Sequence, residues 1–368
     1  MGRYRKPIPG TTARMRVRSL FPAKPMQMPH RCLYSLTMKI MVTGADGSLG
    51  SNLVRVLLEY GHEVRGFRQE GRRSTTLDGL DIERRSGDIL DPDSVVRAFD
   101  GCSAVIHAAA STSIWPPRSE IVRRVNIEGT VNAIAAADKA QMDRFVFIGT
   151  ANSFTPGTKT VPGKEDTPYD GARWGLDYMD SKYEARLRVL EAIRERKLPA
   201  LTVNPTFMIG PYDSTPSSGT MIIRLHQGKV FGYTTGGRCF SHVRDVAVAA
   251  ANALTMGGIG ESYIAGNRNL DYGEFFSLAA EVIGTRPPRA RVPKPLALLV
   301  GAAQSAGAAI TGKPPLLGWA AARIAFGGFY YDPSKARAEL AMPSTPLETA
   351  VRECFDWLKA NRYLEARP

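Results

Sequence analysis

The run Thr43-Gly44-Ala45-Asp46-Gly47-Ser48-Leu49-Gly50 decides the fold of this 368-residue chain. It follows the apolar residues 40–43, which have the pattern of a strand, and precedes the helical residues 51–54. Between a strand and a helix, three such glycines permit a tight turn, close approach of the backbone to a pyrophosphate and close helix-on-strand packing. The run therefore predicts a dinucleotide-binding turn rather than a purely structural one. The predicted cofactor contacts are Gly44, Asp46, Gly47, Ser48, Leu49 and Gly50.

Strand-like and helix-like segments alternate along the first half of the chain. We expect strands at residues 40–43, 63–68, 82–85, 104–107 and 145–149, and helices at residues 51–60, 92–99 and 121–137. This alternation is typical of a parallel sheet covered by helices on both faces, so the expected fold is a doubly wound α/β (Rossmann) fold. After residue 205, clusters of Pro and Gly make the alternation irregular. We therefore expect a dinucleotide-binding domain with the catalytic residues at 38–205 and a smaller C-terminal substrate-binding lobe, interleaved with the last strands, at 206–368.

The end of the second expected strand indicates which dinucleotide is bound. An NAD site usually places Asp or Glu there to accept a hydrogen bond from the ribose 2′-hydroxyl. This chain has Arg68 instead, followed by Arg72 and Arg73. Because a guanidinium forms charge-assisted hydrogen bonds with a 2′-phosphate, NADP is favoured over NAD. The alternative is that Arg68 is an ordinary solvated arginine.

A tyrosine and a lysine stand four residues apart at Tyr178 and Lys182, on one face of an expected helix. A nearby ammonium lowers a tyrosine pKa toward the range that proton transfer needs. Tyr331 and Lys335 have the same spacing, but Pro333 interrupts that helix. Thr150 follows the expected strand at 145–149, at the carboxyl edge where α/β sheets bind ligands. These residues predict a catalytic trio of Thr150, Tyr178 and Lys182.

Together, the TGxxGxxG turn, Thr150 after a strand and Tyr-x-x-x-Lys resemble the extended short-chain dehydrogenase/reductase family, also called the NAD-dependent epimerase/dehydratase family. The resemblance extends from about residue 38 to residue 363. It implies that Tyr178 is the acid/base, that Lys182 holds the nicotinamide ribose, and that Thr150 polarises the reacting carbonyl or hydroxyl. The further cofactor contacts that it implies are Asp88, Ile89, His107, Ala108, Ala109, Asn126, Lys182 and Pro205.

One departure from the family lies directly before Thr150. Family members often carry two small hydroxyl residues there, whereas this chain has Ile148 and Gly149. Thr150 can still donate a hydrogen bond, and Ser153 is the fallback donor if the strand register is shifted.

The substrate is indicated by residues 204–211, which match the stretch where sugar-nucleotide enzymes of this family use an asparagine to bind the diphosphate. Phe207 stands in place of that asparagine, and a phenyl ring cannot hydrogen-bond a phosphate. The run looks more like the dihydroflavonol-reductase-like and hydroxysteroid-dehydrogenase-like branches, although Phe207 as a core residue is the alternative. Ser111 and Arg238 are weaker substrate candidates.

Three functions remain open at this point. The favoured one is an NADP-preferring oxidoreductase that transfers hydride between nicotinamide and the carbonyl or secondary alcohol of an apolar small molecule. The second is a sugar-nucleotide epimerase or dehydratase with retained NAD. The third is a dinucleotide-sensing protein without turnover. The resemblance also implies a homodimer.

Charge is concentrated at the N-terminus. The formal net charge is +13, of which residues 1–37 contribute eight cations and no acid. The remaining surplus does not call for a nucleic-acid partner. The tail lacks the apolar segment of a secretory signal, so it is a non-structural extension, an organelle transit peptide or a binding arm. We expect a cytoplasmic protein, with organelle import as the alternative.

Residues 295–312 form an uncharged, Ala-, Gly- and Leu-rich run. It is marginal for a membrane span, so we expect a buried or lid helix, with membrane contact as the alternative. The four cysteines are widely spaced and have no nearby histidine pair, so we expect neither a metal site nor a disulfide framework.

Overall fold

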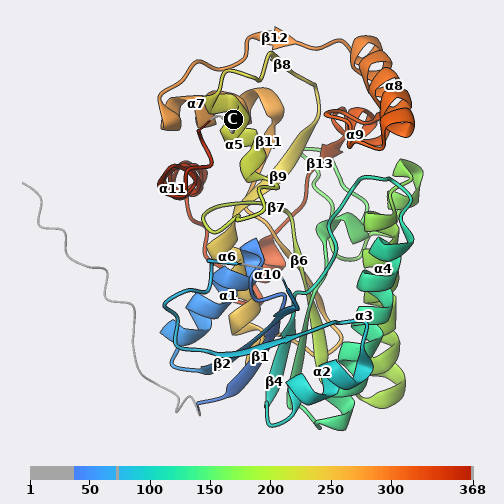
Figure 1. The fold of residues 1–368 in the computed structure, drawn as a ribbon, viewed down its shortest axis with the longest axis vertical. Coiled ribbons are helices and arrows are strands. Elements are labelled where there is room, and N and C mark those ends of the chain that lie inside the picture. The colour runs from blue at the N-terminus through green and yellow to red at the C-terminus, as the bar shows by residue number, and fades with distance from the viewer. Residues whose placement is uncertain (1–36, 72–73, 366–368) are drawn as a thin grey trace, which may run out of the picture. The chain divides into compact units, whose positions relative to one another are not determined.

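The computed structural model describes residues 37–71 and 74–365, and its centre is a seven-stranded parallel sheet in the order β10-β6-β5-β4-β1-β2-β3 (Figure 1). The strands are β1 (Lys39–Thr43), β2 (Glu63–Gln69), β3 (Glu83–Gly87), β4 (Ala104–His107), β5 (Arg144–Ile148), β6 (Ala200–Pro205) and β10 (Ser262–Ala265). The doubly wound parallel sheet predicted from the sequence is confirmed. The expected strand at 145–149 ends one residue early, which leaves Gly149 and Thr150 beyond its carboxyl end.

Helices cover both faces of this sheet. They are α1 (Ser48–Glu59) and α6 (Val243–Asn252) on one face, and α2 (Pro92–Phe99), α3 (Glu120–Lys139) and α4 (Asp177–Arg196) on the other (Figure 1). Each face has its own buried apolar cluster, because strands enclosed on both sides carry apolar residues at nearly every position. In β1, for example, Ile40 and Val42 pack toward α1, and Met41 packs toward the opposite face.

The residues after β6 build a smaller lobe, which occupies the upper half of Figure 1. Its four-stranded sheet consists of β7 (Phe207–Ile209), β9 (Gly237–His242), β11 (Arg268–Asp271) and β13 (Gly328–Phe329). The short strands β8 (Gly232–Tyr233) and β12 (Ala290–Arg291) pair separately. The helices of the lobe are α5 (Gly219–His226), α7 (Tyr272–Ile283), α8 (Lys294–Thr311), α9 (Trp319–Ile324) and α11 (Leu347–Ala360), whereas α10 (Ser334–Glu339) packs against β10 of the central sheet. Two single-turn helices, η1 (Ala151–Ser153) and η2 (Gly171–Trp174), follow β5 and precede α4.

The chain passes from the lobe back into the central sheet at β10, which pairs with β6. It then returns to the lobe through β11, which pairs with β9. The second Tyr-x-x-x-Lys copy is not on one helix, because α10 begins at Ser334, after Pro333. Its members serve packing, since Tyr331 is buried and Lys335 pairs with Glu261.

The apolar run 295–312 forms helix α8. The expectation of a buried helix is wrong, whereas a lid helix and membrane contact stay predictions. The buried side chains of α8 are only the small ones of Ala297, Gly301 and Ala308, and its larger apolar residues face outward. Within residues 37–71 and 74–365, no helix has the length and apolarity needed to cross a membrane.

Candidate functional site

The glycine turn joins β1 to α1 at the carboxyl edge of the sheet. Gly44 adopts φ +65°, and a Cβ added there would lie 2.8 Å from the Cα of Ala109. A Cβ on Gly50 would lie 2.0 Å from the carbonyl oxygen of Gly44, so α1 can approach the turn this closely only with glycine at both positions. Gly47 is the residue before α1, and as a glycine it has no side chain that could cap the helix. The first N–H groups of α1 are therefore available for a pyrophosphate.

The side chain of His107 is hydrogen-bonded to residues next to this turn. Its Nδ1 hydrogen-bonds the Thr43 hydroxyl at 2.8 Å, and the same hydroxyl oxygen accepts a hydrogen bond from the N–H of Ala109 at 3.1 Å. Its Nε2 lies 3.3 Å from the Thr130 hydroxyl. Burial, together with the charge of Lys182, lowers the pKa of His107 to about 3. His107 is therefore neutral, and its hydrogen bonds hold residues 107–109 in place next to the glycine turn. The side chain of His107 thus supports the turn and is not open to a ligand.

Two further predicted cofactor contacts lie beyond β3 and on α3. Asp88 is exposed, and its carboxylate accepts a hydrogen bond from the N–H of Leu90. Asn126 is buried and bonds both the N–H and the C=O of Ser111, and its amide also donates to the hydroxyl of Ser181 at 2.9 Å. Asn126 therefore links the segment after β4 to the helix that carries Tyr178.

Arg68 lies at the carboxyl end of β2, as the sequence predicts. It is half-buried, and its Nε lies 3.4 Å from the hydroxyl of Ser86 on the neighbouring strand β3. Arg72 and Arg73 lie outside the described residues. The position of Arg68 is compatible with a 2′-phosphate contact, which stays a prediction.

Thr150 and Tyr178 meet at the end of β5. The Thr150 hydroxyl lies close enough to that of Tyr178 to affect its pKa, and it accepts a hydrogen bond from the N–H of Asn152 in η1. Burial raises the pKa of Tyr178, whereas the nearby Thr150 hydroxyl and the positive charge of Arg238 lower it. Two members of the trio predicted from the sequence thus lie close together. Ser153, the fallback donor, is also buried, and its hydroxyl has no hydrogen-bond partner among the described residues.

Lys182 lies one helical turn after Tyr178 and is almost fully buried. Its ammonium donates to the carbonyl oxygen of Ile148 at 2.6 Å and lies 4.5 Å from the centre of the Phe147 ring. Burial lowers the pKa of Lys182 to about 7. The positive charge of Arg238 lowers the pKa of Tyr178 in the structure, and the expectation that Lys182 does so as well stays a prediction.

Arg238 comes from β9 of the lobe and is enclosed by aromatic rings. Its guanidinium carbon lies 4.2 Å from the Phe329 ring centre and 5.7 Å from that of Phe207, and its Nε donates to the Tyr272 hydroxyl at 3.1 Å. Phe207 itself packs edge-on against Phe240 in the lobe core. Phe207 is therefore both a packing residue and a neighbour of Arg238.

An apolar cluster surrounds Tyr178. The rings of Trp174 and Phe329 are tilted against each other with their centres 5.5 Å apart, and both belong to the same cluster as Tyr178 and Ile324. Sequence reasoning did not single out Phe329, Tyr272 or Ile324 as neighbours of the candidate site. No local pattern could have done so, because these residues are about 100 to 150 positions away from Tyr178 in the chain.

The departure at Gly149 has a steric cause. A Cβ there would lie 2.2 Å from Oδ1 of Asn204, which is buried at the end of β6. The Asn204 amide nitrogen donates to the hydroxyl of Thr202 at 2.9 Å, which holds the side chain in place. The position of Asn204 therefore leaves room only for glycine at residue 149. The hydroxyl at the end of the strand comes from Thr150, the next residue.

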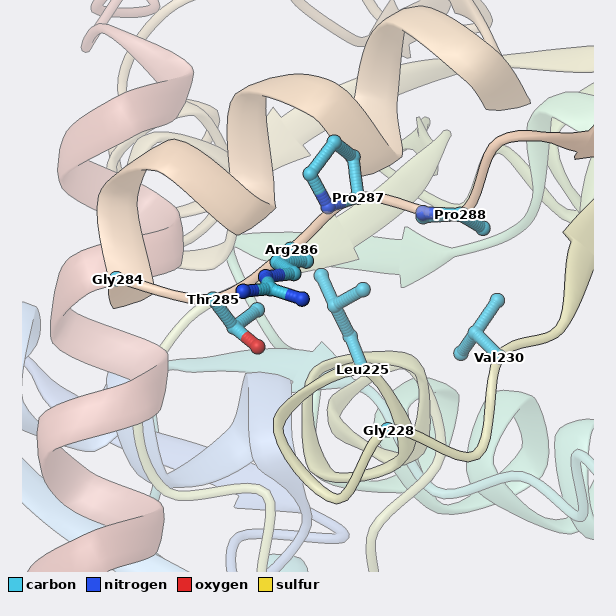
Figure 2. A pocket seen from close by; sticks show the side chains of 8 residues that line it. All are labelled: Leu225, Gly228, Val230, Gly284, Thr285, Arg286, Pro287 and Pro288. Carbon is cyan, nitrogen blue, oxygen red and sulfur yellow. The ribbon is translucent and has the colours of Figure 1, made fainter.

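Pockets elsewhere in the lobe are separate from this cluster. One of about 650 Å³ lies between the ends of α5 and α7, and is lined by Leu225, Gly228, Val230 and residues 284–288 (Figure 2). It contains none of the predicted site residues. Among the described residues, no group of three or more His, Cys, Asp or Glu side chains is arranged to hold a metal ion.

The central sheet and the glycine turn at its carboxyl edge define a nucleotide-binding α/β protein of the Rossmann class. Residues 40–266 match the model of the NAD dependent epimerase/dehydratase family, and the chain belongs to that family.

Individual proteins are similar over most of the chain. A protein from Synechocystis sp. named "Putative dihydroflavonol 4-reductase" is 30% identical over 89% of this chain and 96% of its own length. The "Sterol demethylase protein B" of Methylococcus capsulatus is 29% identical over 88% of this chain and 98% of its own. The crystal structure of a nucleoside-diphosphate-sugar epimerase from Pseudomonas aeruginosa superimposes with a TM-score of 0.71 at 26% identity, over 89% of this chain and 99% of its own. The family and these relatives indicate an NAD(P)-dependent enzyme of the oxidoreductase or epimerase type.

Proposed function

We propose that this protein is an NADP-preferring oxidoreductase that interconverts a ketone and a secondary alcohol on an apolar small molecule. The observation that carries the proposal is the closeness of the Thr150 and Tyr178 hydroxyl groups beside the apolar cluster that contains Tyr178, Trp174 and Phe329. Two hydroxyl groups that converge in an apolar setting suit a substrate with one polar atom to protonate and a hydrophobic body.

The glycine turn fits a dinucleotide, because α1 has an uncapped N-terminus there and Gly44 and Gly50 leave no room for side chains. A nicotinamide dinucleotide bound there would supply the hydride. In the reduction direction, the Tyr178 hydroxyl gives its proton to the substrate oxygen, and the Thr150 hydroxyl holds that oxygen by a second hydrogen bond. Thr150 is buried and Tyr178 is partly buried, which limits competing hydrogen bonds from water.

Lys182 and Arg238 assist in different ways. The ammonium of Lys182 is anchored on the backbone of Ile148, next to the strand end that carries Thr150. From that position it is suited to hold a ribose hydroxyl, as the family resemblance implies. The fixed charge of Arg238 favours the tyrosinate form of Tyr178 and so eases proton transfer in both directions.

A sugar-nucleotide epimerase or dehydratase with retained NAD is the second candidate. It is favoured by the likeness to the Pseudomonas aeruginosa epimerase and by Arg238, whose guanidinium suits a diphosphate. Phe207 argues against it, because its ring lies beside Arg238 and has no group to bind a phosphate.

The deciding experiment is the release of nucleotide from freshly purified protein by denaturation, followed by chromatography. The same batch is then titrated with NADPH and NADH. The proposal expects little bound nucleotide and tighter binding of NADPH. Stoichiometric release of NAD would favour the epimerase or dehydratase, and binding of neither dinucleotide would exclude both.

Tyr178→Phe separates both enzymes from a protein that only senses dinucleotide. It removes the proton donor and leaves the ring in place, so turnover should be lost while nucleotide binding is retained. Thr160→Val, an exposed substitution in the loop after η1, is a matched control for loss of one hydroxyl.

A further inference from the structure

Helix α8 has its larger apolar side chains on the outside. Leu299 is 68% exposed and Ile310 is 87% exposed, and Leu296 and Val300 are exposed as well. With Ala303, these residues recur at the three- and four-residue spacing that places side chains on one face of a helix. We call Leu296, Leu299, Val300, Ala303 and Ile310 the outer face of α8.

The polar side chains of α8 point the other way and are already used. The side-chain oxygen of Gln304 accepts a hydrogen bond from the N–H of Leu317, and the Ser305 hydroxyl accepts one from the N–H of Trp319. A Cβ on Gly301 would lie 2.8 Å from the Cβ of Ala322 on α9. Small and polar residues therefore fix α8 against α9, and within residues 37–71 and 74–365 no element covers the outer face. Figure 1 shows both helices at the margin of the lobe.

The surroundings of α8 are basic. Residues 282–331 contain six cations and no Asp or Glu. Arg291 and Lys294 are exposed at the start of the helix, and Lys313 is exposed just beyond its end. Arg291 and Lys294 also line a hollow of about 310 Å³ together with Thr235 and Phe326. An apolar helix face with cations at both ends is complementary to a lipid surface with anionic head groups above an apolar acyl region.

We propose that the outer face of α8 docks on an anionic lipid surface, with its leucines, Val300 and Ile310 at the acyl boundary and its flanking cations at the phosphates. A second copy of this chain fits less well. A twofold contact through α8 would bring together two copies of residues 282–331, each with six cations and no Asp or Glu. Lys and Arg at the ends of such a helix can bury their stems and keep their charges at the phosphates.

The docked face is connected to the candidate site through α9. Arg323 on α9 donates to the carbonyl oxygen of Arg173 in η2 at 3.1 Å, and Ile324 packs in the same cluster as Tyr178. Lipid contact at α8 would therefore place the membrane next to the elements that cover the site. Docking needs no turnover, so it is independent of the proposed reaction.

The test is cosedimentation of the full chain, without cofactor or substrate, with vesicles. One set contains phosphatidylglycerol and phosphatidylcholine, and the other contains phosphatidylcholine alone. The test variant is Leu299→Asp/Ile310→Asp, in which two exposed side chains are changed. The matched control is Val161→Asp/Ile259→Asp, which puts the same charges on exposed apolar residues in loops outside α8 and α9. Thermal unfolding of all three proteins checks that they are folded.

We expect binding to the anionic vesicles that weakens with salt, at least about tenfold weaker binding by the α8 variant, and unchanged binding by the control. The proposal is overturned if the wild type does not bind, or if the α8 variant binds as well as the wild type. The second result would assign binding to another basic segment, such as residues 1–37. Sedimentation velocity of the wild type and the α8 variant tests whether a second copy of the chain covers this face. That conclusion would follow if the wild type does not bind vesicles and the α8 variant forms a smaller assembly than the wild type.

Discussion

Replacement of Gly149 by serine tests why this chain departs from its family beside Thr150. The new Cβ would lie 2.2 Å from Oδ1 of Asn204 and 3.2 Å from its Cγ. Asn204 cannot easily withdraw, because its amide nitrogen is within hydrogen-bond distance of the Thr202 hydroxyl and the Tyr263 carbonyl. Overpacking of this kind costs about 1–3 kcal/mol of unfolding free energy. We expect Gly149→Ser to be destabilising by that amount.

The cause is isolated by a double-mutant cycle with Asn204→Ala. That single change removes the atoms that the serine would meet, at the cost of the hydrogen bonds of Asn204, about 0.5–1.5 kcal/mol each. In the double variant the serine has room, so the total loss should be smaller than the sum of the two single losses. We expect a coupling of about 1–2 kcal/mol. The assay is equilibrium denaturation of all four proteins, with the midpoint and slope compared.

A glycine with open surroundings supplies the control. A Cβ on Gly307 in α8 would meet nothing within 4 Å, so Gly307→Ser should leave stability unchanged or slightly raise it. If the losses from Gly149→Ser and Asn204→Ala are additive within about 0.5 kcal/mol, the steric explanation of Gly149 is refuted.

Three further predictions concern charges at the candidate site. Arg238→Met should move the pH dependence of turnover toward higher pH, because it removes a charge that lowers the pKa of Tyr178; an unshifted profile would contradict this role. Lys182→Met should flatten the dependence of unfolding free energy on pH. The pKa of Lys182 is about 7 in the folded protein, below that of a free lysine, so the unfolded wild type binds more protons between about pH 7 and 10.5. The stability of the wild type relative to the variant should therefore rise across that window, which denaturation at several pH values will measure. Arg68→Glu should weaken NADPH binding by about tenfold or more and affect NADH much less, whereas equal losses would mean that Arg68 does not contact the 2′-phosphate.

The parts of the fold that local patterns determine were predictable. The glycine turn is one, because a backbone that packs within 2.0 Å of a would-be Cβ requires glycine at a fixed spacing. The parallel sheet is another, since continuous apolar strands enclosed on both faces leave a strong signal in sequence. Residues at strand ends, such as Thr150, follow from the same reasoning.

Contacts between distant segments were not predictable in the same way. Gly149 and Asn204 are 55 positions apart, and no local sequence pattern indicates that they are in contact. Helix α8 illustrates a different limit. An apolar run indicates burial by composition, but here the small and polar residues face inward, and the large apolar ones face outward. Which face of a uniformly apolar helix packs is decided by its neighbours, in this case α9.

The environment of Arg238 determines how it can influence Tyr178. A guanidinium that loses water becomes costly unless other groups compensate, and here the faces of Phe329 and Phe207 and the Tyr272 hydroxyl do so. The charge is thus held within the lobe by groups of the protein itself, and it does not need an anionic substrate to stabilise it. It follows that Arg238 already lowers the pKa of Tyr178 before any substrate binds, and that an uncharged, apolar substrate can benefit from it. The lobe would then supply part of the proton-transfer machinery, and not only the wall that selects the substrate.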